Sequence, residues 1–447
     1  MGRRRVEPPV FLQKRNGSQC RIFPIFQTLV RCISALSLVF LCISIATLLR
    51  LDSNPTFVSL HENDSVVTAT HDPYFLIRNP PSFTVTNTTC SAPPGTGEEG
   101  PEGVRALYKI YVHQHDQLHE EALNSVPQQS KSKRRIRLVC MVYTHSNRHD
   151  VLRAVAETYG QRCDGFLAAS NLTDPSIGAF ALTHDGPEEY GNMWNKVQKM
   201  WLYAYQHYLR QFDWFFICGD DTYAIPENLR KVAAYYEDTE KKKGPNGIPP
   251  LYLGASIPNS KNLRRRFCGG GAGYMLNQQA VLLLNRRILM GECPDAMASD
   301  EDIRVARCLD DAGVQCHDTN DAAEEVRFHH LDAQFHASWT PRRVSVWLWP
   351  KLQRFHGIRG NQSKLEQISN TSTTFHLVKS KVRSKERDRG MRRYHAILNP
   401  ELCGSDFVDQ VREAALCSAG RQAELQKEWA KTDIQGASKK SGKATAR

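Results

Sequence analysis

The stretch 214–223 constrains the fold of this chain most, because it places two acids directly after a run of apolar residues. Its sequence is Trp-Phe-Phe-Ile-Cys-Gly-Asp-Asp-Thr-Tyr, and Pro226 and Glu227 then open a helix. Ligands of open α/β sheets bind beyond the carboxyl ends of the strands, so Asp220 and Asp221 are predicted to lie near a substrate. Two carboxylates there suit a hard divalent cation that also takes oxygens from a phosphate. The alternative is an acidic turn that caps the helix.

Strands and helices alternate along the chain before this stretch, which predicts an α/β fold. The apolar run 137–143 predicts a buried strand, and a polar turn and a helix through about Tyr159 follow it. Strand, turn and helix in this order are typical of the start of a nucleotide-binding unit. Apolar residues then recur at helical spacing from Met193 to Tyr208, and we interpret this stripe as core packed against the sheet.

Two later motifs carry side-chain or backbone chemistry. Four glycines fall within 269–273 and let the backbone approach a ligand closely, although a tight turn without a ligand also explains them. An acidic cluster at 299–302 precedes a helix, where acids favour the helix dipole without any catalysis. The functional interpretation is that one of these acids accepts a proton.

A histidine-rich segment follows, with three histidines between Phe328 and His336. A neutral imidazole there could complete a metal site, whereas a single histidine would usually be structural.

Residues 32–49 form an uncharged, apolar run between Arg31 and Arg50. Its length is at the short end for a membrane-spanning helix. Seven Lys or Arg residues precede it, which predicts a cytosolic N-terminus and a single-pass type II anchor rather than a cleaved signal peptide. A buried core helix is the alternative.

The cysteines and sequons agree with that topology. Ten of the thirteen cysteines follow the apolar run, where an oxidising compartment would permit disulfides, and their pairing cannot be deduced from sequence. Asn-x-Ser/Thr sequons begin at Asn63, Asn87, Asn171, Asn361 and Asn370.

The net charge of +11 does not indicate nucleic-acid binding. The basic residues gather at the N-terminus, in 131–137 and in 379–393, with no aromatic or glycine-rich RNA-binding signature beside them. We therefore predict no nucleic-acid partner.

The predicted organisation has five parts. They are a cytosolic tail at 1–31, a transmembrane signal-anchor at 32–50, a proline- and glycine-rich stem at 51–134 with a helix over 104–122, a catalytic domain at 135–345, and a C-terminal extension at 346–447. The extension is basic and predicted to be partly disordered, with little order after about Gln426.

Taken together and in this order, the motifs resemble the β1,3-glycosyltransferases of the fringe and core 1 galactosyltransferase family. The resemblance covers about residues 137–342, and the anchor and stem match the family's layout. It depends on Trp214-Phe215 leading to 220–223, on Gln161-Arg162-Cys163, on 228–230, on 270–274, on Glu301-Asp302 with Arg307-Cys308, and on Phe328-His329.

The resemblance implies a GT-A, Rossmann-like α/β fold, a UDP-sugar donor, Mn²⁺ and inversion at the anomeric carbon. By position, Asp221 and His329 match metal ligands, and Asp220 would bind the donor ribose or the metal. Asp302 matches the catalytic base, with Glu301 as the second acid of the catalytic pair. Gly270 to Tyr274 would line the space between donor and acceptor, with Gly270, Gly271 and Tyr274 as donor-binding residues.

Three positions depart from the family pattern. Gly219 replaces the first of three consecutive acids, Tyr159 stands where many members carry tryptophan, and Ala306 where they carry glycine. The first departure concerns donor binding, and the others concern packing and substrate choice.

The predicted function is transfer of galactose, β1,3-linked, from UDP-galactose to O-linked GalNAc of glycoproteins, by a Golgi or early secretory membrane enzyme. Family relatives are often homodimers. The alternatives are a fringe-like β1,3-N-acetylglucosaminyl- or other hexosyltransferase and an inactive chaperone-like relative. A glycosidase with two flanking carboxylates would not explain the histidine.

Overall fold

The structure is a computed structural model that describes residues 87–90, 93–95, 99–123, 134–242, 247–258, 265–294, 297–339, 365–378 and 388–416. All of these belong to one compact unit, 71–447. The predicted cytosolic tail and membrane anchor lie outside the described residues. Within the described ranges, no helix has the length and apolar character needed to cross a membrane.

A seven-stranded sheet with the strand order β10-β6-β9-β4-β1-β2-β3 forms the centre of this unit. The strands are β1 (Leu138–Tyr143), β2 (Gly165–Ser170), β3 (Ala179–Ala181), β4 (Trp214–Gly219), β6 (Tyr252–Gly254), β9 (Tyr274–Asn277) and β10 (Cys316–Asp318). Strand β9 runs antiparallel to both neighbours, and the other pairs are parallel. The predicted α/β class is confirmed, and the parallel-dominated sheet is consistent with a GT-A-like fold.

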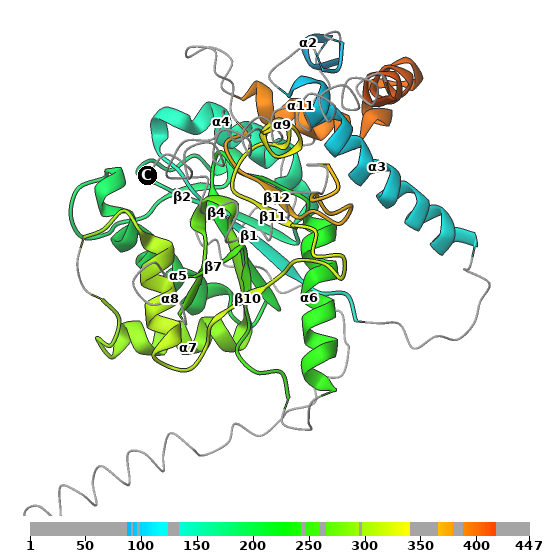
Figure 1. The fold of residues 1–447 in the computed structure, drawn as a ribbon. Helices are drawn as coiled ribbons and strands as arrows, with labels where there is room; N and C mark the ends of the chain where they lie inside the picture. The colour runs from blue at the N-terminus through cyan, green and yellow to red at the C-terminus, as the bar shows by residue number, and fades with distance from the viewer. Residues whose placement is uncertain are drawn as a thin grey trace, which may run out of the picture. The chain divides into compact units, whose positions relative to one another are not determined.

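Alternating side chains of β1 and β4 enter two separate cores. One face of the sheet packs against α4 (His149–Glu157) and α6 (Pro226–Lys241), and the other against α5 (Met193–Tyr208), α7 (Gln278–Leu289) and α8 (Glu301–Asp310). Figure 1 shows α5, α7 and α8 gathered on one side of the strands and α6 on the other. The apolar stripe of α5 is core, as its spacing predicts.

The ordered body extends beyond the predicted catalytic domain on both sides. Helix α3 (Gly100–Leu123) contacts α9 (Ala333–Ser338) and α11 (Arg389–Leu398), and Val104, Leu107 and Ile110 are fully buried. A further helix covers 405–416. Parts of the predicted stem and of the predicted C-terminal extension are therefore packed against the predicted catalytic domain.

Two smaller sheets flank the carboxyl end of β4. One has the order β11 (Phe328–His329), β12 (Thr374–Phe375) and β5 (Tyr223–Ala224), and the other joins β7 (Ser256–Pro258) to β8 (Arg266–Cys268). The first sheet brings 374–376 beside the residues that directly follow Asp220 and Asp221. Short 3-10 turns complete the fold: η1 (Ser146–Arg148), η2 (Tyr159–Arg162), η3 (Pro175–Ile177), η4 (Tyr190–Asn192), η5 (Gly270–Ala272) and η6 (Pro400–Cys403), and α2 (Asn87–Cys90) precedes α3.

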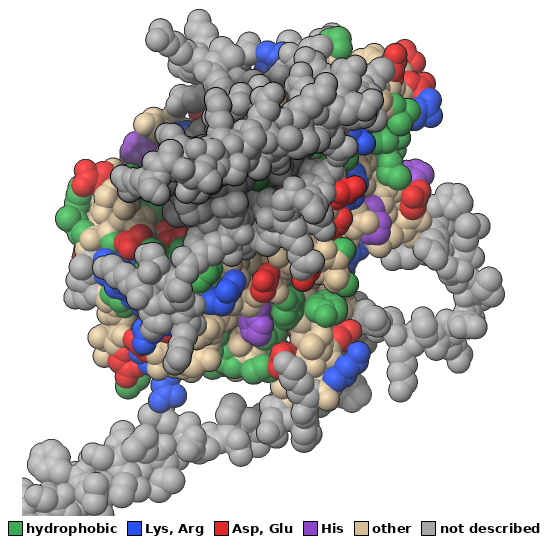
Figure 2. Space-filling model, in the orientation of Figure 1, with side chains coloured by type: hydrophobic (Ala, Val, Ile, Leu, Met, Phe, Trp, Pro, Cys, Tyr) green, Lys and Arg blue, Asp and Glu red, His purple; other side chains and the backbone are tan. Residues whose placement is uncertain are grey.

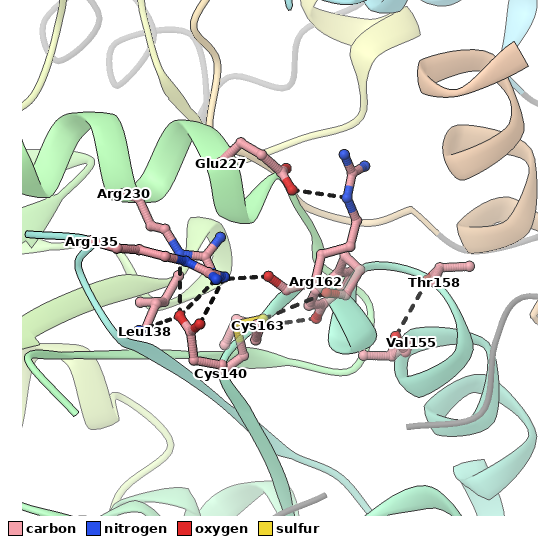
Figure 3. Close-up of a disulfide and its surroundings, with 12 residues drawn as sticks. Arg135, Leu138, Cys140, Val155, Thr158, Arg162, Cys163, Glu227 and Arg230 are labelled. Carbon is pink, nitrogen blue, oxygen red and sulfur yellow. Dashed lines mark hydrogen bonds and ion pairs between the residues drawn. A yellow bond between two sulfur atoms is a disulfide. The ribbon is translucent and has the colours of Figure 1, made fainter. Parts of the chain in front are cut away.

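Four disulfides join Cys90 to Cys403, Cys140 to Cys163, Cys268 to Cys316, and Cys293 to Cys308. This confirms that disulfides form among the cysteines that follow the predicted anchor. Figure 3 shows the Cys140–Cys163 pair that ties β1 to the turn before β2. The next residue, Asp164, carries a carboxylate. Arg135 and Arg230 bind this carboxylate at 2.9 and 2.8 Å.

Acidic and basic side chains are interspersed over the described part of the face in Figure 2. This part of the surface therefore lacks the single-sign field that would attract a polyanion.

Candidate functional site

Asp220, directly after β4, is held by an arginine. It is 6% exposed, and Arg148 Nε and Nη2 donate to both of its oxygens at 2.6 to 2.9 Å. Thr144 Oγ1 donates a further hydrogen bond of 2.7 Å. Burial raises the pKa of Asp220, and the contacts to Arg148 and Thr144 act against that shift. Both oxygens therefore have protein partners at the end of the strand.

Asp221 is more open and lies against the imidazole of His376. The two side chains are 19% and 23% exposed, and Asp221 Oδ1 is 3.4 Å from His376 Nε2. His376 Nδ1 lies 2.9 Å from the carbonyl oxygen of His330, which can only accept, so Nδ1 donates. His376 therefore directs Nε2 at the carboxylate.

His329, the predicted metal ligand, lies one strand away on β11. Its side chain is fully buried, with Nε2 3.0 Å from Ser372 Oγ and the ring stacked on Phe375 at 4.5 Å. The backbone of His376 donates to the His329 carbonyl at 3.1 Å. His329 thus supports the strand that places His376 at Asp221.

The sequence contained a signal for His376. Phe375-His376 repeats the Phe328-His329 dipeptide, but it falls in the segment assigned to a basic extension. Its position at Asp221 depends on the pairing of β12 with β5.

The residues at Asp221 fit a divalent cation that keeps some of its water. Within the described ranges, no group of three or more His, Cys, Asp or Glu side chains is placed to hold a metal. A cation of the Mg²⁺ type, however, is commonly bound through one or two carboxylates and substrate phosphates. His376 also has the second contact typical of metal-binding histidines, a donated hydrogen bond to a backbone carbonyl.

The glycine turn η5 connects this pair to the second acidic cluster. Thr222 Oγ1 donates to the Gly271 carbonyl at 2.9 Å, and Gly270 N donates to Asp302 Oδ2 at 2.8 Å. A Cβ on Gly271 would lie 2.7 Å from His376 Nδ1, and one on Gly270 would clash with Glu301 Oε1. A side chain at either position would therefore require His376 or Glu301 to move.

Asp302 and Glu301 begin α8 and differ in exposure. Asp302 is partly exposed and accepts from Gly270 N and Ile303 N, while burial raises the pKa of Asp302. Glu301 is 4% exposed and accepts from the hydroxyl of Tyr274 at 2.8 Å. Burial, followed by the charge of Asp302, raises the pKa of Glu301 well above its usual range.

The structure therefore brings most of the predicted site residues together through β4, η5, β9 and α8. Asp221, Gly270, Gly271, Glu301, Asp302 and Tyr274 are linked by the contacts above. Arg148 and His376 were not predicted, and each is a partner of one acid of the Asp220–Asp221 pair. Chemically, the site offers a carboxylate and an imidazole for a cation, and a second carboxylate with a raised pKa for a proton.

No protein-family model matches this chain. Over 229 residues this chain is 27% identical to glycoprotein-N-acetylgalactosamine 3-beta-galactosyltransferase 1 of Xenopus laevis. The matched stretch covers 51% of this chain and 59% of that protein. It is 33% identical over 116 residues to human chondroitin sulfate glucuronyltransferase and 30% identical over 126 residues to chondroitin sulfate synthase 3 of Mus musculus. Each of these two matches covers 26% of this chain, and they cover 14% and 13% of the relatives. The matches thus span about three fifths or less of the relatives, and they confirm the resemblance that the motifs predict.

Proposed function

We propose that this chain, a relative of the β1,3-glycosyltransferases, is an inverting glycosyltransferase of the GT-A type. Its predicted reaction is transfer of galactose from UDP-galactose, in β1,3 linkage, to O-linked GalNAc of glycoproteins. The similarity to the frog protein supports the choice of donor and acceptor. The observation that carries the proposal is the connection of the Asp221–His376 pair to Asp302 through Gly270 and Gly271.

Asp221 and His376 are the proposed ligands of Mn²⁺, with His376 in the role that the sequence assigned to His329. A bound Mn²⁺ would neutralise the charge that develops on the leaving diphosphate. The donor set supports this assignment, because Nε2 of His376 faces a carboxylate oxygen while Nδ1 is held by a carbonyl.

Asp302 is the proposed general base. It would accept the proton of the acceptor hydroxyl as that oxygen bonds to the anomeric carbon and the bond from this carbon to the UDP oxygen breaks. Its raised pKa suits a group that must hold a proton during the reaction. Glu301, buried against Tyr274, is proposed to fix the start of α8 and the turn η5.

Asp220 is proposed to organise the donor side of the site instead of binding the metal. Its oxygens bind Arg148 and Thr144, which follow the end of β1. The guanidinium is thereby fixed at the sheet edge where a nucleotide is expected.

The cellular setting remains part of the proposal. A type II anchor at 32–50 would place the described residues in the Golgi or early secretory lumen, where their four disulfides could form. The expected partners are the membrane, a UDP-sugar and an O-GalNAc glycoprotein, and a homodimer is the expected assembly.

The test is a panel of UDP-sugars with the purified full-length chain, Mn²⁺ and a GalNAc-α-linked acceptor peptide. We expect transfer from UDP-galactose, a β1,3 linkage by NMR, and loss of transfer in EDTA. Transfer of N-acetylglucosamine or glucuronic acid instead would indicate another hexosyltransferase, a choice that the chondroitin relatives also support. If the chain neither binds UDP nor transfers sugar from any donor, the proposal is contradicted and the inactive, chaperone-like relative is favoured.

A further inference from the structure

Tyr143 ends β1 at the edge of the sheet where the proposed site lies. Its Cα is paired with that of Gly219 at the end of β4. Side chains alternate along a strand, so Tyr143 shares a face with Val139 and Met141. This is the face that packs against α8, the helix that begins with Glu301 and Asp302.

Gly219 provides the space in which the Tyr143 ring lies. A Cβ on Gly219 would be 3.2 Å from Tyr143 Cε2 and 3.2 Å from Asp221 Oδ1. Any side chain at position 219 would therefore press on the ring, on the proposed metal ligand, or on both. The absence of an acid at position 219 therefore leaves the space that the Tyr143 ring occupies.

The hydroxyl of Tyr143 is available to a ligand. None of the described residues forms a hydrogen bond with it. Burial raises the pKa of Tyr143 well above its usual range, and the charges of Glu301, Asp221 and Asp302 add to the shift. The phenol therefore keeps its proton and can donate a hydrogen bond within the field of these carboxylates.

We propose that Tyr143 is a specificity-determining residue that donates a hydrogen bond to a ring hydroxyl of the transferred sugar. The inference rests on the proposed function and deepens it. The sugar must lie between a diphosphate held near Asp221 and an acceptor hydroxyl near Asp302. The Tyr143 ring lies beside Asp221 at Gly219, and Tyr143 is within the field of Asp302. A neutral phenol between acids suits a sugar hydroxyl, which both donates and accepts, better than it suits a cation.

The experiment compares Tyr143→Phe with the wild-type full-length chain. Calorimetry in Mn²⁺ measures binding of UDP and of UDP-galactose, and kinetics give kcat/KM for UDP-galactose, UDP-glucose and UDP-N-acetylglucosamine. We expect unchanged UDP affinity and a loss of about tenfold in kcat/KM for the preferred donor, the upper range for one neutral hydrogen bond. For the poorer donors kcat/KM should change less than about twofold. The ratio of kcat/KM between the preferred donor and the poorer donors therefore becomes smaller in the variant.

The matched control is Tyr236→Phe. This removes a hydroxyl of α6 that donates to the carbonyl of Asp318, on the opposite face of the sheet, and should leave donor preference unchanged. Thermal unfolding of both variants reports any loss of folding.

Three outcomes would overturn the inference. Equal kcat/KM in Tyr143→Phe and wild type for every donor would leave the hydroxyl without a role. Equal losses for UDP and for all UDP-sugars would place its contact on the diphosphate. If the wild-type chain binds no UDP-sugar, the proposed function fails and this inference fails with it. If the wild-type chain transfers sugar and Tyr143→Phe has the same kcat/KM for every donor, only this inference fails.

Discussion

The two acid pairs of the site have a similar arrangement but different partners. In each pair one acid is buried and its neighbour is partly exposed: Asp220 with Asp221 after β4, and Glu301 with Asp302 at the start of α8. The buried acid binds a guanidinium in the first pair and a phenol in the second.

This difference indicates which pair can hold a cation and which can hold a proton. Arg148 forms a charged hydrogen-bonded pair with Asp220 and acts against the rise in the pKa of Asp220 that burial causes. Glu301 has no such cation in its described contacts, and burial raises the pKa of both acids of its pair. The strand end thus suits a metal ion, and the helix start suits proton transfer.

The largest expected effect is that of Asp302→Asn. Removing the proposed base should lower kcat about 1,000-fold, since general base catalysis contributes about 10² to 10⁴. Single-turnover transfer measures the loss, and calorimetry should show unchanged UDP affinity. The matched control is Asp300→Asn, which loses a 3.4 Å contact to Arg304 and one nearby charge but leaves the carboxylate of Asp302 in place. Full activity in Asp302→Asn would remove the proton role from this pair.

The next effect tests the cation role of the first pair. His376→Ala should weaken Mn²⁺ binding to the UDP-bound protein about 100-fold, because it removes one of two proposed ligands. His329→Ala should instead lower the unfolding temperature, since it removes a buried imidazole bonded to Ser372. Mn²⁺ titrations and thermal unfolding separate the two. The reverse result would restore His329 as the ligand.

The pH dependence of transfer sharpens the contrast. Because burial raises the pKa of Asp302, the base is lost as pH falls through a value above the usual 3.9 or so. Below that value kcat/KM should drop about tenfold per pH unit. The profile is measured at saturating Mn²⁺, with far-UV circular dichroism to exclude acid unfolding. An acid limb at the ordinary aspartate value would contradict the raised pKa.

The smallest effect is on stability. The pKa of Glu301 is higher in the folded than in the unfolded protein, so the unfolded state ionises first as pH rises past about 4.3. The stability that the protonated acid contributes is fully present below that pH and is lost as pH rises toward the folded value.

Glu301→Gln should therefore gain stability relative to wild type as the pH rises from 4 to 7.5. Denaturant unfolding at both pH values measures this difference. Glu189→Gln, at an exposed position, is the control. An equal pH dependence in Glu301→Gln and wild type would mean that Glu301 is ionised in the folded protein.

The sequence predicted the parts of the site that local motifs encode. The buried strand before Asp220 and Asp221, the glycine turn and the acidic helix start each show within a few residues, and the structure joins them. The partners of these acids could not be predicted in this way. Arg148 lies 72 positions before Asp220, and His376 follows a two-residue strand that has no periodicity to detect.

The boundaries of the folded part of the chain could not be predicted from sequence for a related reason. A proline- and glycine-rich composition indicates a spacer, but α3 carries a buried apolar side that meets its partners only through tertiary contacts. The helix over 104–122 was predicted from sequence, and its burial was not.

The packing of α3 against α11 has a practical consequence for shortened forms of the protein. Arg393 and Glu99 form an ion pair of 2.7 Å with both side chains 3% exposed, and Cys90 is bonded to Cys403. A recombinant chain that began at residue 135 would lose the ion pair between Arg393 and Glu99 and leave Cys403 without its disulfide partner. Soluble versions of this protein should therefore start before Cys90.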